Sequence, residues 1–154
     1  LAVAGHPDFQ LSRLEAEREG VSYSIDTLRT LHQTIGKEAQ LFFIIGMDAF
    51  AEIYTWKAYR QLLNYASFVV IGRPDQCRQS CGQTEAIHFP GYTFAEGLGC
   101  WQGEPGRGAI YPVAMAPVKV SSSEIREEVR QRRSIRNRVP GAVADYIEAQ
   151  GLYR

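Results

Sequence analysis

The fold is decided by two apolar stretches, Leu41-Phe42-Phe43-Ile44-Ile45-Gly46 and Ser67-Phe68-Val69-Val70-Ile71-Gly72, each of which stops at a glycine. Both have the length of a strand, and neither alternates between apolar and polar residues. Uninterrupted apolar strands are typical of parallel sheets that are covered on both faces. We therefore expect residues 41–45 to form a central parallel strand and residues 67–71 to form a second buried strand.

Helical patterns lie on either side of these strands. Apolar residues recur at helical spacing from Ile25 to Ile35, with Ser22 and Ser24 as candidate caps and Gly36 at the end. Residues 75–108 show no readable pattern, and we assign no element to them. We expect two further helices over residues 48–54 and 57–65 and a short strand over 110–114. Another helix is expected to start with a capping box formed by Ser121 and Glu124. The last helix is expected to have Pro140 at its first position, Gly151 after its end, and an inward face of Val143, Tyr146 and Ile147.

Composition restricts the class of protein further. Alternating strands and helices in 154 residues predict one α/β domain. The 17 basic and 17 acidic residues give a formal net charge of zero, so no field of the whole protein favours nucleic acid or a membrane surface. No apolar run reaches the length of a spanning helix. Three cysteines are too few for a disulfide framework, which favours a reducing compartment, and we expect the cytoplasm.

The glycine-terminated strands carry candidate ligand-binding residues. In an open parallel sheet, ligands bind beyond the carboxyl ends of the strands. Gly46 permits close approach of a ligand, and Asp48 either meets ribose hydroxyls there or caps the following helix. Arg73 follows the second strand, where its guanidinium either meets a phosphate or a nucleotide edge or lies exposed in a turn.

Hydroxyl-rich turns precede two of the predicted helices. Ser121, Ser122 and Ser123 add donors to the free N–H groups of a helix start, and Arg126 lies one turn further on. The segment is either an anion site or an ordinary capping box. The Ser22-Tyr23-Ser24 stretch presents the same two alternatives.

Three other features carry weaker alternatives. Trp56 is either a packing residue or a platform for a heteroaromatic ring. Cys77, Cys81, His88 and Cys100 match none of the common zinc-site spacings. The basic stretch from Arg130 to Arg138 is interpreted as a solvated face, because the chain as a whole is neutral.

Taken together and in order, these segments resemble the bacterial-type nicotinate mononucleotide adenylyltransferases. The resemblance covers nearly the whole chain except residues 75–108. The matching segments are Val120-Ser121-Ser122-Ser123-Glu124-Ile125-Arg126 to the family's I-S-S-T-x-I-R, Ser22-Tyr23-Ser24 with Thr27-Leu28 to S-Y-T-x-x-T-L, Gly46-Met47-Asp48 to G-x-D, Trp56 to the family's tryptophan, Arg73-Pro74 to R-P, and Val139-Pro140 with Tyr146-Ile147 and Gly151-Leu152-Tyr153 to its ending.

One family element has no match in residues 1–154. This is G-x-F-D-P-x-H-x-G-H, which lies on the family's first strand and helix and supplies two histidines. The resemblance therefore implies a Rossmann-like parallel sheet flanked by helices, with the chain representing the C-terminal part of a longer enzyme as a single nucleotidyltransferase domain. We expect this stretch alone to be inactive.

The resemblance implies transfer of the adenylyl group of ATP to nicotinate mononucleotide, which yields deamido-NAD and pyrophosphate. Mg²⁺ would accompany ATP, no nucleic acid or membrane would take part, and the oligomeric state stays open. A non-catalytic nucleotide-binding module and an adenylyltransferase for nicotinamide mononucleotide are the alternatives. The resemblance implies three groups of site residues. The ATP phosphates would contact Ser121, Ser122, Ser123 and Arg126, with Ser123 and Arg126 as the catalytic pair, and the adenylyl side would contact Gly46, Asp48 and Arg73. The mononucleotide would contact Ser22, Tyr23, Ser24, Trp56 and Lys57: Trp56 would stack on the nicotinate ring, and backbone N–H groups near Ser24 and Lys57 would receive its carboxylate.

Overall fold

A computed structural model describes residues 1–36, 38–72, 88–116, 118 and 120–154. The chain divides into two compact units, one of residues Leu14–Pro117 and the other of Leu1–Arg13 with Val118–Arg154. Within the described residues, no helix is long and apolar enough to cross a membrane.

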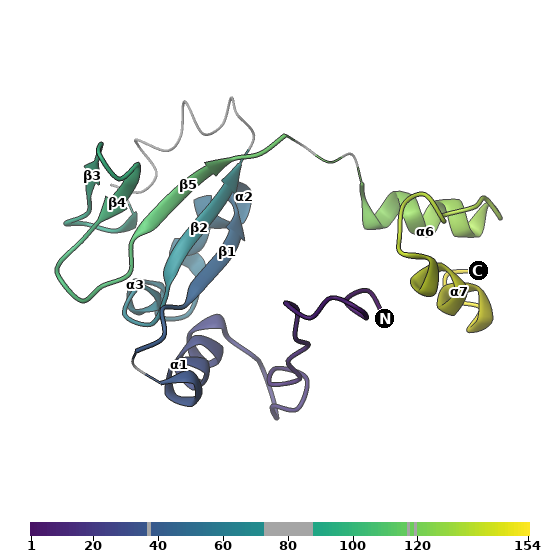
Figure 1. Cartoon of the computed structure of the whole chain (residues 1–154), viewed down its shortest axis with the longest axis horizontal. Coiled ribbons are helices and arrows are strands. Elements are labelled where there is room, and N and C mark those ends of the chain that lie inside the picture. The colour runs from purple at the N-terminus through teal and green to yellow at the C-terminus, as the bar shows by residue number, and fades with distance from the viewer. Residues whose placement is uncertain (37, 73–87, 117, 119) are drawn as a thin grey trace. The chain divides into compact units, whose positions relative to one another are not determined.

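The unit of residues 14–117 contains a five-stranded sheet in the order β1-β2-β5-β4-β3. β1, β2 and β5 are parallel to one another, whereas β4 is antiparallel to both β5 and β3 (Figure 1). The expected parallel sheet is therefore a mixed one. The elements are α1 (Ser24–Ile35), β1 (Phe42–Gly46), α2 (Met47–Ala51), the 3-10 helix η1 (Ile53–Thr55), α3 (Tyr59–Leu62), β2 (Ser67–Gly72), β3 (Thr93–Ala95), β4 (Cys100–Gln102) and β5 (Ile110–Ala114).

The core of this unit lies on one face of the sheet. Ile45, Phe68 and Val70 are buried there. On the other face of β1, Phe42 and Ile44 are 50% and 65% exposed. The expectation of a central strand covered on both faces is therefore wrong for β1 as described. β1 lies at the end of the described sheet, and α2 is the helix that packs on it.

Two helix starts differ from the prediction. The residue before α1 is Tyr23, and no side chain caps this helix. The residue before α2 is Gly46, so Asp48 lies in the first turn of α2 and does not cap it. α1 does end before Gly36, whose φ of 95° is a conformation that glycine adopts without strain.

The stretch without a readable pattern contains β3 and β4. Each has only three residues, which is too short for a periodic signal. Tyr92, just before β3, is buried and donates a hydrogen bond of 2.8 Å from its hydroxyl to the carbonyl oxygen of Gly108. Burial raises the pKa of Tyr92. The hydroxyl therefore remains protonated at neutral pH and keeps the loop before β5 attached to the core.

The second unit contains α6 (Ser122–Arg130) and α7 (Gly141–Ala149). Ile135 and Ala144 are its buried apolar residues among those described. Tyr146, expected to face inward, is 49% exposed, because Ala144 occupies the buried side of this helix. Several arginines of the basic stretch form ion pairs with acidic residues, namely Arg130 with Glu127, Arg136 with Asp145, and Arg138 with Glu124 and Glu128.

Candidate functional site

The first candidate surface is the start of α1. Tyr23 has an extended backbone (φ −109°, ψ 141°), and the helix begins at Ser24. The first N–H groups of a helix have no acceptor within it. In the described part of the chain, the N–H groups of Ser24 and Ile25 donate to no other group. The helix begins here because Ile25 and Leu28 are buried, while Asp26 favours the positive end of the helix dipole.

Trp56 lies in the segment between η1 and α3. Its backbone is extended (φ −78°, ψ 145°), and Ala58 then takes a left-handed conformation (φ 50°, ψ 37°) that leads into α3. The indole is partly buried against the core and meets the ring of Phe43 edge-on, with 6.2 Å between the ring centroids. Packing therefore holds the indole in place and leaves part of it accessible for stacking.

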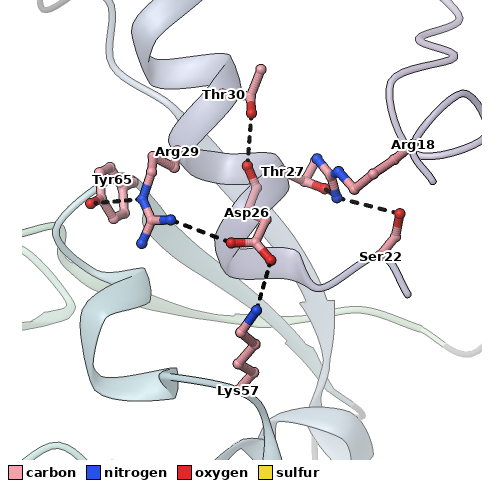
Figure 2. A network of polar contacts seen from close by, with 8 residues as sticks. All are labelled: Arg18, Ser22, Asp26, Thr27, Arg29, Thr30, Lys57 and Tyr65. Atoms are coloured by element: carbon pink, nitrogen blue, oxygen red, sulfur yellow. Dashed lines mark hydrogen bonds and ion pairs between the residues drawn. The ribbon is translucent and has the colours of Figure 1, made fainter. Parts of the chain in front are cut away.

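Lys57 connects this segment to the start of α1. Its ammonium nitrogen lies 3.1 Å from Oδ2 of Asp26 and 4.2 Å from the centroid of the Tyr23 ring. Both are favourable contacts for a cation. Figure 2 shows the Lys57 side chain reaching the carboxylate of Asp26 in the first turn of the helix. The structure thus brings Tyr23, Ser24, Trp56 and Lys57 to one place.

The other oxygen of the Asp26 carboxylate holds a second cation. Oδ1 lies 3.3 Å from a guanidinium nitrogen of Arg29, and Arg29 also donates to the Tyr65 hydroxyl at 3.4 Å (Figure 2). The contact with Tyr65 raises the pKa of Arg29, which stays charged. No motif in the sequence predicted Asp26, Arg29 or Tyr65 as site residues. The i,i+3 spacing of Asp26 and Arg29 is a local signal for this ion pair, but nothing local relates Asp26 to Lys57 or Arg29 to Tyr65.

Two hydroxyls of the α1 start are used within the chain. The Ser22 hydroxyl donates to the backbone oxygen of Glu15 at 3.2 Å, and the Thr27 hydroxyl donates to the Glu15 carboxylate at 2.7 Å. Arg18 donates to both hydroxyl oxygens, at 3.3 and 3.1 Å (Figure 2). These bonds attach the segment before α1 to the helix. The Ser24 hydroxyl has no partner in the described part of the chain.

The second candidate surface is the carboxyl ends of β1 and β2. Gly46 pairs with Ile71 in the parallel register, so the two strands end beside each other. Gly46 is exposed, and a Cβ there would meet nothing within 4 Å. Asp48 follows as an exposed carboxylate in the first turn of α2. Arg73, the third predicted residue of this edge, lies outside the described residues.

The third candidate surface is the start of α6, in the other unit. Ser121 precedes the helix with an extended backbone (φ −124°, ψ 132°), and its side chain forms no capping bond, so the predicted capping box is not formed. Arg126 donates to the Ser123 hydroxyl at 3.3 Å. The exposed hydroxyls of Ser122 and Ser123 and the partly exposed guanidinium of Arg126 therefore gather at one helix start.

Possible metal ligands do not cluster in the described residues. No group of three or more His, Cys, Asp or Glu side chains in the described ranges could hold an ion. Cys100 is a buried free thiol, and Cys77 and Cys81 lie outside the described residues.

Comparison with curated proteins finds relatives that all carry the same name. Proteins called probable nicotinate-nucleotide adenylyltransferase from Thermus thermophilus and Geotalea daltonii are 38% and 37% identical over 154 and 157 residues. The matches cover 100% and 99% of this chain and 69% and 70% of those relatives. A relative of the same name from Moorella thermoacetica is 34% identical, and 64% of its length is covered. No family model matches the chain.

Solved structures show the same fold. The Plasmodium falciparum nicotinic acid mononucleotide adenylyltransferase, determined with NaAD and with APC, aligns with a TM-score of 0.57 at 18% identity. The alignments cover 88% of this chain and 58% and 60% of those structures. The chain thus spans somewhat more than half of the solved structures that it matches.

Proposed function

This chain belongs to the nicotinate-nucleotide adenylyltransferase family, and we propose that the full-length protein transfers the adenylyl group of ATP to nicotinate mononucleotide. The products are deamido-NAD and pyrophosphate, so the reaction is a step of NAD biosynthesis. We place it in the cytoplasm, where ATP is available. The observation that supports the mononucleotide side is the contact of Lys57 with Asp26 and Tyr23, which holds the Trp56 segment against the start of α1.

The mononucleotide is proposed to bind between Trp56 and the start of α1. The accessible part of the indole offers a flat surface for the nicotinate ring. The free N–H groups at Ser24 and Ile25 provide donors at the positive end of a helix dipole, which favours a carboxylate. A carboxamide would direct its NH₂ group at some of these donors and leave them unpaired, which selects the acid over the amide. Ser22 supports this turn through its bond to Glu15.

The contacts with ATP are assigned from the family pattern, separately in each unit. Gly46 and Asp48 receive the adenylyl side, where the glycine admits the ligand and the carboxylate accepts from ribose hydroxyls. Arg73 is assigned to the same side from the family pattern. Ser121, Ser122, Ser123 and Arg126 are assigned to the phosphates, for which hydroxyls, helix N–H groups and a guanidinium are suitable donors.

The reaction joins the two ligands without a covalent enzyme intermediate. An oxygen of the mononucleotide 5′-phosphate attacks the α-phosphorus of ATP, the bond from that phosphorus to the β-phosphate oxygen breaks, and pyrophosphate leaves with the electron pair. The contribution of the protein is to position both ligands and to neutralise charge. Ser123 and Arg126 would stabilise the charge that develops on the phosphates.

Mg²⁺ is proposed to arrive with ATP. The described residues offer no cluster of three acidic or histidine ligands, which fits an ion held mainly by phosphate oxygens and water. When bound, the ion would neutralise phosphate charge.

The test of the proposed activity is turnover by the full-length protein with ATP and either nicotinate mononucleotide or nicotinamide mononucleotide. We expect pyrophosphate release with the acid and a kcat/KM at least about tenfold lower with the amide, because of the donors left unpaired. A preference for the amide would favour the adenylyltransferase for nicotinamide mononucleotide.

A non-catalytic nucleotide-binding module is the second candidate, because the family's histidine element has no match in residues 1–154. The coding sequence ahead of Leu1 distinguishes the two. A G-x-F-D-P-x-H-x-G-H element encoded there favours the enzyme. A natural start near Leu1, with binding of both ligands and no pyrophosphate release, favours the module.

Two substitutions are expected to separate the substrates. Arg126→Ala should raise the KM for ATP about tenfold or more, since it removes a charged donor to phosphate. Trp56→Ala should raise the KM for the mononucleotide by about tenfold, the usual effect of losing one stacking partner. Steady-state kinetics with each substrate varied in turn measure both, and Leu98→Ala, at a residue that is 65% exposed, serves as the control. Equal effects of either variant on both KM values would contradict the assignments.

A further inference from the structure

A carboxylate outside the predicted site binds one of its members directly. Asp26 accepts from Lys57 through Oδ2 at 3.1 Å and from Arg29 through Oδ1 at 3.3 Å. Its side chain is 29% exposed, whereas that of Lys57 is 50% exposed. The more buried partner therefore determines where the flexible lysine side chain lies.

The carboxylate is itself held on its other side. Arg29 is one helical turn beyond Asp26, and its guanidinium lies 3.4 Å from the Tyr65 hydroxyl and 5.7 Å from the centroid of the Tyr65 ring. Tyr65 lies just before β2 and packs against the core. Figure 2 shows the line of contacts from Tyr65 through Arg29 and Asp26 to Lys57, so Asp26 is connected through Arg29 to a residue that packs on the core.

Lys57 connects the two halves of the proposed mononucleotide site. One half is the turn at Tyr23 and Ser24, and the other is the indole of Trp56, which adjoins Lys57 in the chain. The ammonium group touches the Tyr23 ring at 4.2 Å while it is bonded to Asp26. The lysine side chain is thereby held by two residues at the start of α1.

We propose that Asp26 is a positioning residue for the mononucleotide: by holding Lys57 it fixes the distance between the Trp56 ring and the N–H groups at the start of α1. This inference rests on the proposed function, because it assigns the mononucleotide to that place.

The experiment is a set of Asp26 variants in the full-length protein. Asp26→Asn removes the charge at constant size, and Asp26→Glu keeps the carboxylate. For Asp26→Asn we expect the KM and the Kd of nicotinate mononucleotide to rise about three- to fivefold, the upper range for a partly exposed ion pair. The KM of ATP and kcat should stay within about twofold, and Asp26→Glu should recover most of the loss.

Two controls separate this effect from general destabilisation. Asp145→Asn removes an exposed carboxylate that pairs with Arg136, and it should leave the KM of both substrates unchanged. The charge-exchanged double variant Asp26→Lys with Lys57→Asp should bind the mononucleotide better than the single variant Asp26→Lys, because it restores an attractive pair. Denaturation midpoints of all variants identify any that are merely unstable.

The outcomes are distinct. A rise of the mononucleotide KM alone, with recovery in Asp26→Glu, supports the inference. An unchanged or lower Kd in Asp26→Asn overturns it, as does an equal rise for both substrates, while wild-type turnover keeps the proposed function in place. A wild-type protein that neither binds nor converts the mononucleotide overturns the proposed function and this inference with it.

Discussion

Among single residues, Gly108 shows how closely the backbone segments before β2 and β5 approach each other. Its N–H donates to the Leu63 carbonyl at 2.6 Å, and its own carbonyl accepts from the Tyr92 hydroxyl. A Cβ at this position would lie 2.2 Å from the backbone oxygen of Ala66. No real side chain tolerates such a distance, so only glycine fits between these segments.

Gly108→Ala is therefore expected to lower the free energy of unfolding by about 1–3 kcal/mol, the usual cost of forcing a methyl group into packed structure. The matched control is Gly97→Ala, where a Cβ meets nothing within 4 Å and φ is not positive. The control should change stability by less than about 0.5 kcal/mol. Urea denaturation of the full-length protein measures both, and equal midpoints for the two variants would contradict the close approach at Gly108.

At the scale of elements, α2 depends on tertiary packing. It has five residues, and helices this short are unstable in water. Phe50 is fully buried, edge-on to Phe68 and stacked on Phe89, with 6.0 Å between ring centroids in each pair. Because α2 also carries Asp48, the packing of Phe50 determines where a proposed ribose-binding carboxylate lies.

Phe50→Ala is expected to cost about 3–5 kcal/mol of stability, the range for removing a large aromatic side chain from a core. In the fraction of the variant that still folds, the KM for ATP should rise more than the KM for the mononucleotide, because Phe50 lies in the same short helix as Asp48. Calorimetric unfolding and steady-state kinetics give the two values, with Leu98→Ala as an exposed control. A larger effect on the mononucleotide would contradict the assignment of α2 to ATP.

The two units of the chain carry different proposed ligand-binding surfaces. The start of α1 and the ends of β1 and β2 belong to residues 14–117, and the start of α6 belongs to the other unit. The large buried cluster lies in the first unit, whereas Ile135 and Ala144 are the buried apolar residues described in the second. A test of ligand binding must therefore measure the two units separately.

Hydrogen exchange with mass spectrometry provides that test. A non-hydrolysable ATP analogue is expected to slow exchange in residues 121–126, and nicotinate mononucleotide in residues 22–25, because each ligand accepts from helix-start N–H groups. Residues 141–149 in α7 serve as the internal control and should be unaffected by either ligand. Protection of residues 121–126 by the mononucleotide alone would reverse the assignment.

Much of this architecture was predictable from local patterns. α1, β1, β2, β5, α6 and α7 were all expected close to their observed positions, because buried strands and amphipathic helices leave periodic signals. β3 and β4 were missed because three-residue strands leave none. The one-sided burial of β1 was missed because an apolar run does not state which neighbours cover it.

By itself, the sequence determined most of the helices and the longer strands and, through its order of motifs, the family to which the chain belongs. The tertiary structure decided that the sheet is mixed, that Tyr92 anchors Gly108, and that Asp26 holds Lys57 beside Tyr23. The physical reason is the distance along the chain over which each signal acts. Side-chain periodicity acts over a few residues, whereas Asp26 and Lys57 are 31 positions apart and meet only because α1 and the segment before α3 pack on the same core.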